Sequence, residues 1–172
     1  WLYSIQLPQK IFLQKFQITQ TLKALKISKI PSFIIMPNND SGYKNIVKKI
    51  KFSKLKWTPT LSLSEYKTIL KNCSFLIGNS SSGIHEASTY KKPVINIGTR
   101  QNKRLQSNNI INVGYDYKKI DQKINFVLEN KRFLKKLRNI KNPYGDGNSS
   151  VKIIKILKKL NLKENTQKNN TY

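Results

Sequence analysis

Short apolar runs alternate with stretches of helical periodicity along nearly the whole chain. The runs have strand character, and most are followed by a segment whose apolar residues recur every three or four positions. Alternation of this kind predicts βαβ units, in which helices bury both faces of a parallel sheet. We therefore expect an α/β fold with a Rossmann-like parallel sheet. The expected strands lie in WLYSI (1–5), PSFIIMP (31–37), FSKLKW (52–57), CSFLIG (73–78), PVINIG (93–98) and IINVG (110–114).

Helices are expected between these strands and at the end of the chain. FIIM and FLI are unbroken apolar runs, which is typical of central parallel strands. PYGDGNSS (143–150) has turn chemistry, and its serines can cap a helix over VKIIKILKKL (151–160). The first helix is expected over 12–25, with one broad apolar face formed by Phe12, Phe16, Leu22 and Leu25.

The chain has 172 residues, which is enough for one domain with a real core but too few for two ordinary domains. We expect that domain over residues 1–162 and a disordered polar tail over 163–172. The chain opens at Trp1 without signal-peptide features, which suggests a piece of a longer protein.

No apolar run approaches the about 20 residues that span a bilayer, so no membrane partner is expected. The single Cys73 has no disulfide partner and no cluster for a metal, which favours a reducing cytoplasm. We expect Cys73 to be a buried, small apolar side chain, and we expect no metal or cofactor.

The net charge of +25 comes from 33 Lys and Arg residues against 8 Asp and Glu residues. Such an excess is typical of proteins that bind nucleic acid or anionic surfaces. Only four of the 33 basic residues are Arg, whereas base and phosphate recognition favours the guanidinium group. The lysines are also dispersed along the chain. We therefore favour a solvated Lys-rich surface, and a Lys-dependent nucleic-acid-binding module remains the alternative.

In open α/β sheets, ligands bind at the carboxyl ends of the strands, where loops lead into helices. Three such junctions have chemistry beyond a simple turn. They are MPNNDSG (36–42), IGNSSSGIHE (77–86) and NIGTRQNKR (96–104).

The second junction predicts an anion site. Backbone N–H groups and the hydroxyls of Ser80, Ser81 and Ser82 would face a ligand at the positive end of a helix. Gly78 and Gly83 would let the backbone approach that ligand closely. Phosphate oxygens are the expected acceptors.

Glu86 lies about one helical turn beyond Ser82, and helix side chains lean back towards the N-terminus. Its carboxylate could accept both hydroxyls of a vicinal diol while phosphates lie on the serines, which is the layout of a ribose next to a diphosphate. The alternative is structural: Ser82 or Gly83 caps the helix, and Glu86 reaches back to the cap.

The third junction places Arg100 beside the serine turn, with Lys103 and Arg104 nearby. These cations would neutralise a diphosphate or bind another anionic group. A basic, solvated loop is the alternative.

In the first junction, Asn38 can hydrogen-bond the polar edge of a ligand, and Asp40 and Gly42 can form the turn into the next helix. Turn formation alone would also explain this stretch. His85, the only histidine, is expected to be an exposed helical side chain rather than a general base.

At these residues the sequence resembles the hydrolysing UDP-N-acetylglucosamine 2-epimerases of sialic-acid and related nonulosonic-acid synthesis. The resemblance implies the GT-B arrangement, in which two Rossmann-like domains hold a UDP-sugar in the cleft between them. This chain resembles the C-terminal, nucleotide-binding domain, and the N-terminal domain is absent. The segments that show the likeness are PNNDSG (37–42), NCSFLIGNSSSGIHEA (72–87), KPVINIGTRQNKR (92–104) with NIINV (109–113), and NPYGDGN (142–148).

The family's ligand contacts carry over by motif, and they imply UDP-N-acetylglucosamine or a relative as the ligand. The implied contacts are Ser80 and Ser81 to the diphosphate, Glu86 to the ribose, Arg100 to the ligand, Asn38 to the nucleotide, and Leu61, before the helix that contains Tyr66, near the uracil.

The family's reaction removes the proton at sugar C2, expels UDP from C1 and adds water to the resulting glycal, which requires acid and base groups. Most candidate carboxylates lie in the absent domain, and the family's histidine after the first strand is replaced by Gln6 or a neighbour. Catalytic residues are therefore unassigned in this chain. We expect one of three explanations: the first residues are read from a truncated, frame-disrupted gene, the chain pairs with a separate N-terminal half, or it is inactive.

The resemblance implies a homodimer for the complete enzyme. A GT-B glycosyltransferase domain is a second interpretation, because it would also use a ribose-binding Glu. The GTRQ and YGDG segments argue against it.

Overall fold

The computed structural model describes the backbone of residues 2–39 and 42–160, with side chains from Lys15 onward. None of the helices in this part of the chain is both long and apolar enough to cross a membrane. The helices are α1 (Leu2–Ser28), α2 (Tyr43–Phe52), α3 (Leu63–Asn72), α4 (Ser81–His85), α5 (Tyr117–Glu129), α6 (Lys131–Leu137) and α7 (Ser149–Leu157). The strands are β1 (Phe33–Ile35), β2 (Lys56–Thr58), β3 (Leu76–Gly78), β4 (Val94–Ile97) and β5 (Ile110–Val113).

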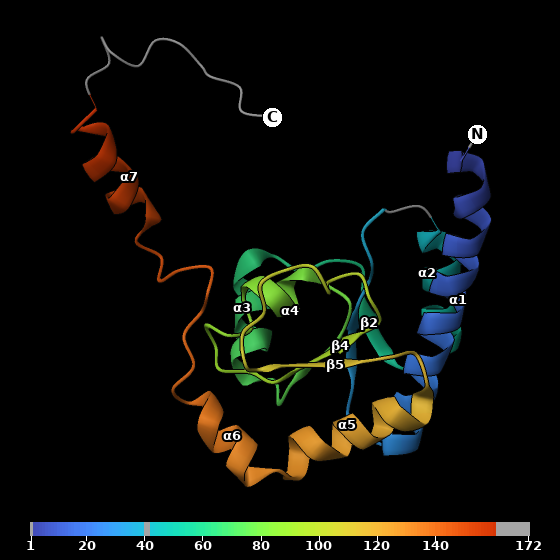
Figure 1. Cartoon of the computed structure of the whole chain (residues 1–172). Helices are drawn as coiled ribbons and strands as arrows, with labels where there is room; N and C mark the ends of the chain where they lie inside the picture. The colour runs from blue at the N-terminus through green and yellow to red at the C-terminus, as the bar shows by residue number, and fades with distance from the viewer. Residues whose placement is uncertain (1, 40–41, 161–172) are drawn as a thin grey trace.

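All strand pairs are parallel, and helices connect most of them, which confirms the predicted α/β class (Figure 1). β1 pairs with β2 in one sheet, and β3, β4 and β5 pair in that order in a second sheet. The register of the second sheet places Ile77 opposite Ile95 and Ile95 opposite Ile111.

The strand expected at WLYSI is wrong, because residues 2–5 belong to helix α1. In a doubly wound sheet the first strand lies at the centre, between the second and the fourth. Without it, β1 and β3 have no strand between them in the described structure, and two sheets replace the single expected one. β1 is also half-exposed rather than buried on both faces, since the exposed fractions of Phe33 and Ile35 are 48% and 39%.

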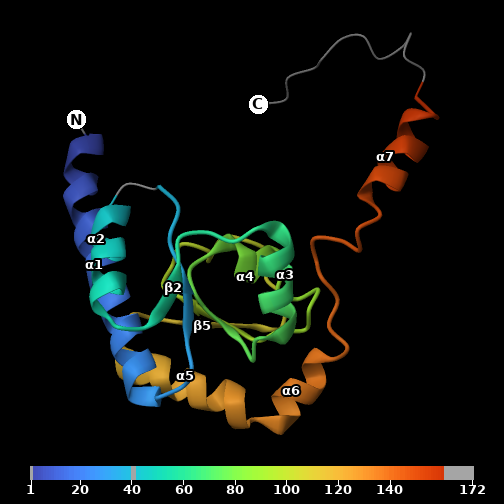
Figure 2. The ribbon, with the colours of Figure 1, turned by 180° about the vertical axis from the view of Figure 1, so that it is seen from behind.

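β4 is the most deeply buried strand, and its side chains alternate between two apolar clusters. On one face, Ile95 and Ile97 pack with residues of α1 and α5. On the other face, Val94 packs with Leu70 of α3 and with Ala87, just after α4. Figures 1 and 2 show the same layers, with α5 on one side of β5 and α3 and α4 on the other. The carboxyl ends of β3 and β4 therefore deliver their loops beside α4.

Three local expectations are corrected by the structure. The predicted face of the first helix holds for Leu22 and Leu25, which are buried, but Phe16 is largely exposed and the Phe12 side chain lies outside the described part. FSKLKW is not a strand throughout, because Phe52 ends α2 and the strand starts at Lys56. Cys73 is half-buried rather than buried; its thiol donates to the Leu70 carbonyl at 3.5 Å, and partial burial raises its pKa.

Helix α7 forms where predicted, but its cap differs from the expectation. The N-cap is Asn148, whose side chain makes no capping hydrogen bond, and the serines are the first helical residues. α7 has no buried residue and lies away from the sheets in both views. The tail predicted to be disordered (163–172) lies outside the described residues.

Candidate functional site

The serine turn leaves β3 at Gly78 and enters α4. Gly78 has a φ of 143°, a conformation that L side chains rarely adopt. Ser80 is the N-cap of α4, and its hydroxyl oxygen accepts a hydrogen bond from the Ser82 N–H at 3.3 Å. The alternative in which Ser82 or Gly83 caps the helix is therefore wrong. Because α4 has only five residues, an anion here would depend on the turn's own N–H groups and hydroxyls more than on a helix dipole.

Gly83 has a packing role rather than the predicted ligand-approach role. It is buried, and a Cβ at this position would lie 2.9 Å from Cγ1 of Val94. Real Cβ atoms are hardly ever this close to another carbon, so glycine lets α4 lie directly on β4. This close packing holds the serine turn at the carboxyl edge of the sheet.

Glu86 follows α4 directly, and its side chain reaches back to the serines as expected. The Ser82 hydroxyl donates to Oε2 of Glu86 at 3.0 Å. The same hydroxyl contacts the hydroxyl of Tyr66, which comes from α3. Ser80, Ser82 and Glu86 are thus linked by hydrogen bonds, with the exposed Ser81 between them in the chain.

The GTRQ loop lies beside the serine turn, as the sequence predicts, and Gln101 makes the connection. Gln101 is only 1% exposed, and its Nε2 donates to the Asn79 carbonyl at 2.8 Å. Arg100 and Lys103 on the same loop are exposed. Sequence reasoning singled out the cations and missed Gln101, because nothing local indicates that its amide is buried.

His85 lies in α4 as expected, but it is half-buried rather than exposed, and its side chain has partners. Nη1 of Arg104 lies 2.6 Å from Nε2 of His85, and Arg104 donates because a guanidinium has no acceptor. The imidazole also contacts the Tyr144 ring, with a centroid separation of 4.2 Å. Arg104 therefore binds the histidine in this structure rather than standing free for an anion.

The NPYGDGN segment joins the same region from far along the chain. Nδ2 of Asn142 donates to the His85 carbonyl at 2.8 Å and to Oγ1 of Thr89 at 2.7 Å. The Tyr144 hydroxyl donates to the Leu105 carbonyl at 2.9 Å. This segment thereby connects α4 to the loop that follows β4.

The other predicted contacts are less closely tied to the serine turn. Asn38 is exposed after β1, and Leu61 is half-buried before α3; among the described residues neither forms a hydrogen bond to the turn. Gly42 is the N-cap of α2 with a φ of 89°, which confirms its turn role. Asp40 lies outside the described residues.

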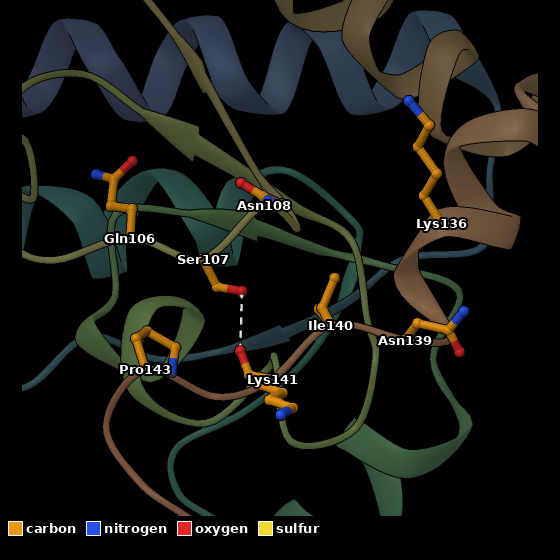
Figure 3. Close-up of a pocket in the computed structure, with 8 residues that line it drawn as sticks. All are labelled: Gln106, Ser107, Asn108, Lys136, Asn139, Ile140, Lys141 and Pro143. Atoms are coloured by element: carbon orange, nitrogen blue, oxygen red, sulfur yellow. Dashed lines mark hydrogen bonds between the residues drawn. The ribbon is translucent and has the colours of Figure 1, made fainter.

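A separate open cleft of about 430 Å³ lies beside the start of β5 and contains none of the predicted site residues. Residues 106–108 line one side, and Lys136 with residues 139–141 and Pro143 line the other (Figure 3). The Ser107 hydroxyl donates across it to the Lys141 carbonyl at 3.4 Å. The cleft is polar, but the sequence motifs and the hydrogen bonds between them meet at the serine turn, which is the candidate site.

The chain is similar in sequence to several named proteins. A family model described as UDP-N-acetylglucosamine 2-epimerase matches residues 11–158. A Neisseria meningitidis serogroup B protein named UDP-N-acetylglucosamine 2-epimerase is 38% identical over 104 residues, which are 59% of this chain and 28% of that protein. The Legionella pneumophila protein named UDP-N,N'-diacetylbacillosamine 2-epimerase (hydrolyzing) is 31% identical over 86% of this chain and 39% of its own length. The polysialic acid biosynthesis protein P7 of Escherichia coli is 30% identical over 83% of this chain and 38% of its own length.

Solved structures show the same fold. A co-structure of Staphylococcus aureus MnaA with UDP superposes with a TM-score of 0.67 at 20% identity, covering 91% of this chain and 44% of that one. The Methanocaldococcus jannaschii UDP-GlcNAc 2-epimerase in complex with UDP-GlcNAc and UDP superposes with a TM-score of 0.66 at 22% identity, covering 87% of this chain and 41% of that one. The matched part of this chain spans between 28% and 44% of the length of these relatives. Because the family model matches most of its residues, the chain belongs to the UDP-N-acetylglucosamine 2-epimerase family.

Proposed function

We propose that this chain is the UDP-binding, C-terminal part of a hydrolysing UDP-N-acetylglucosamine 2-epimerase. The substrate would be UDP-N-acetylglucosamine, the products N-acetylmannosamine and UDP, and the pathway cytoplasmic synthesis of sialic or related nonulosonic acids. Family membership supports the chemistry. The names of the Legionella and E. coli relatives support the hydrolysing subtype and the pathway.

The observation that carries the proposal is the Glu86 carboxylate held beside the serine turn by the Ser82 hydroxyl at 3.0 Å. Phosphate oxygens would accept hydrogen bonds from the N–H groups and hydroxyls of Ser80 and Ser81. Ionised Glu86 has no hydrogen to donate, so it suits the two hydroxyls of a ribose. Contacts from elsewhere on the chain would complete the site: Arg100 towards the diphosphate, and Asn38 and Leu61 towards the base.

Hydrolytic epimerisation needs more groups than this site offers. A base must take the proton from sugar C2 while UDP leaves from C1, and water must then add to the glycal. Since the chain spans about two fifths of its relatives, we assign these acid and base groups to the remaining part of the complete enzyme. We therefore expect this chain alone to bind UDP without turning over the sugar nucleotide.

Calorimetric titration of UDP into the purified chain tests the proposal. Binding to one side of a cleft should be weak, with a Kd in the high micromolar to millimolar range, or about −4 to −6 kcal/mol. Glu86→Ala removes a charged hydrogen-bond acceptor and should cost about 1.5–3 kcal/mol. Ser81→Ala removes a hydrogen bond to a charged phosphate and should weaken UDP binding by a similar amount.

Matched controls separate these effects from general changes of charge or stability. Glu129→Ala removes an exposed carboxylate at the end of α5, and Ser74→Ala removes an exposed hydroxyl before β3. Neither should change the affinity for UDP. If the folded wild-type chain does not bind millimolar UDP, or if all four variants bind equally well, the proposed site is wrong.

A further inference from the structure

Three side chains form a continuous line of hydrogen bonds: one from α3, one from α4, and one from the residue that follows α4. Tyr66 of α3 contacts the Ser82 hydroxyl, and Ser82 donates to Oε2 of Glu86 at 3.0 Å. A serine hydroxyl has one hydrogen, which Ser82 gives to the carboxylate. With Ser82 donating to Glu86, Tyr66 donates to the Ser82 oxygen, and the line runs from phenol to serine to carboxylate, with the Tyr66 hydroxyl also close to Glu86 itself.

The surroundings of Tyr66 keep it in place as a donor. Its ring packs against the cluster of Leu70, Ala87 and Val94, which fixes the ring between α3 and β4. Burial, followed by the nearby charge of Glu86, raises the pKa of Tyr66, so its hydroxyl stays protonated at neutral pH. A protonated phenol can donate to Ser82, whereas a phenolate could not.

The start of α3 is held as well. The Ser62 side chain accepts from the Glu65 N–H, and the Glu65 carboxylate accepts from the Ser62 N–H at 2.8 Å, which is a complete capping box. Tyr66 is the next residue, and its own N–H donates to the Ser62 carbonyl at 2.9 Å. These hydrogen bonds therefore fix the backbone at Glu65 and Tyr66, and with it the start of the Tyr66 side chain.

We propose that Tyr66 is a positioning residue for diol recognition by Glu86. By fixing Ser82, Tyr66 holds one carboxylate oxygen of Glu86 and leaves the other directed to the hydroxyls of a ribose. This inference rests on the proposed function and gives Ser82 a new role, as a holder of the carboxylate rather than a phosphate ligand.

The expected benefit is preorganisation. A free, exposed Glu side chain loses rotamer freedom when it binds a ligand, and that loss weakens binding. A carboxylate already held by Ser82 has lost much of this freedom before the ligand arrives. Removing the Tyr66 hydroxyl should thus weaken contacts to the ribose and leave contacts to the diphosphate unchanged.

Tyr66→Phe tests the proposal, because it removes the hydroxyl and keeps the ring that packs against the cluster. Three probes are titrated into each protein: UDP, 2'-deoxy-UDP and inorganic pyrophosphate. The affinity for UDP should fall by about 3- to 10-fold, the effect of losing one net hydrogen bond. The wild-type preference for UDP over 2'-deoxy-UDP should shrink, and pyrophosphate affinity should not change.

Tyr90→Phe is the matched control. Tyr90 packs against the same cluster but forms no side-chain hydrogen bond within the described structure, so its hydroxyl should not matter for any probe. A variant in which Ser82→Ala and Tyr66→Phe are combined provides a second test. If Tyr66 acts through Ser82, the double variant should bind UDP no more weakly than Ser82→Ala alone.

The outcomes separate the two proposals. If the folded wild-type chain does not bind UDP, the proposed function fails and the ribose role of Glu86 fails with it. If wild type binds UDP but Tyr66→Phe keeps the same ratio of UDP to 2'-deoxy-UDP affinity, only the role of Tyr66 is overturned. Equal losses for all three probes, or additive effects in the double variant, would also overturn it.

Discussion

Among individual residues, glycines in the site loops meet two different physical requirements. Gly83 allows close packing, since a side chain there would meet Val94. Gly98, which follows β4 and opens the GTRQ loop, has a φ of 78°, and a Cβ there would also overlap the Tyr115 ring. The direction in which this loop leaves the sheet therefore depends on the absence of a side chain at Gly98.

Gly98→Ala should lower the free energy of unfolding by about 1–3 kcal/mol, because it combines an unfavourable backbone conformation with overpacking. Urea unfolding, monitored by circular dichroism, measures the change in the free energy of unfolding. Gly114→Ala is the control, since a Cβ there has no heavy atom within 4 Å. Equal unfolding midpoints for the two variants would contradict the role assigned to Gly98.

How much of the site was predictable depends on whether its parts are close in sequence. Ser80, Ser82 and Glu86 lie within one turn and its helix, so their association follows from local geometry. Tyr66 and Gln101 reach the turn from other elements, 16 residues before Ser82 and 22 residues after Asn79. A single sequence does not reveal such contacts, because they depend on how α3 and the loop after β4 pack on the sheet.

At the scale of elements, the N-terminus of α3 supports both the fold and the proposed diol site. Ser62→Ala removes the capping side chain and should lower the free energy of unfolding by about 1 kcal/mol at neutral pH. Chemical denaturation of both proteins measures this difference. Ser74→Ala is the control, because it removes an exposed serine hydroxyl outside α3 and leaves the cap intact. An unfolding midpoint for Ser62→Ala equal to that of wild type would contradict the stabilising role of the cap.

The stabilisation by this cap should depend on pH. Hydrogen bonds from the Ser62 side chain, and then from its backbone, lower the pKa of Glu65 below its ordinary value of 4.5. Because the folded-state pKa is the lower one, the contribution of Glu65 is present above the unfolded-state value and is lost as pH falls through the folded-state value. The stability difference between wild type and Ser62→Ala should therefore narrow under acidic conditions, and a constant difference would contradict this account.

The strands show why the element order was only partly predictable. β4 has four buried residues, of which all but Asn96 are apolar, and this apolar composition made it recognisable. WLYSI is also rich in apolar residues, but its described residues 2–5 are helical, because a strand needs hydrogen-bonded neighbours that its own sequence does not specify. The half-exposure of β1 has the same origin, since no described strand lies on its other side.

For the molecule as a whole, the charge of +25 is compatible with a nucleotide pocket and with a nucleic-acid surface. The salt dependence of binding distinguishes the two. Each phosphate contact to a polyanion releases counterions, so DNA affinity should fall by orders of magnitude between about 50 and 200 mM salt. A pocket for a single UDP should lose much less affinity over the same range.

Titrations of UDP and of a 20-nucleotide DNA probe at both salt concentrations compare the two modes. We expect measurable UDP binding at the higher salt concentration and DNA binding only at the lower one. Tight DNA binding that persists at the higher salt concentration, together with no detectable UDP binding, would favour the nucleic-acid alternative.

The contacts of Asn142 and Tyr144 with α4 and the Leu105 carbonyl also define where the chain could be shortened. Up to Tyr144, the C-terminal segment holds α4 and the residues after it in place, and removing it would release His85 and Thr89. Beyond Asn148, helix α7 is fully exposed and buries none of its side chains. The chain could therefore be shortened between Tyr144 and Asn148, and fusions or tags placed after this point would leave the serine turn undisturbed.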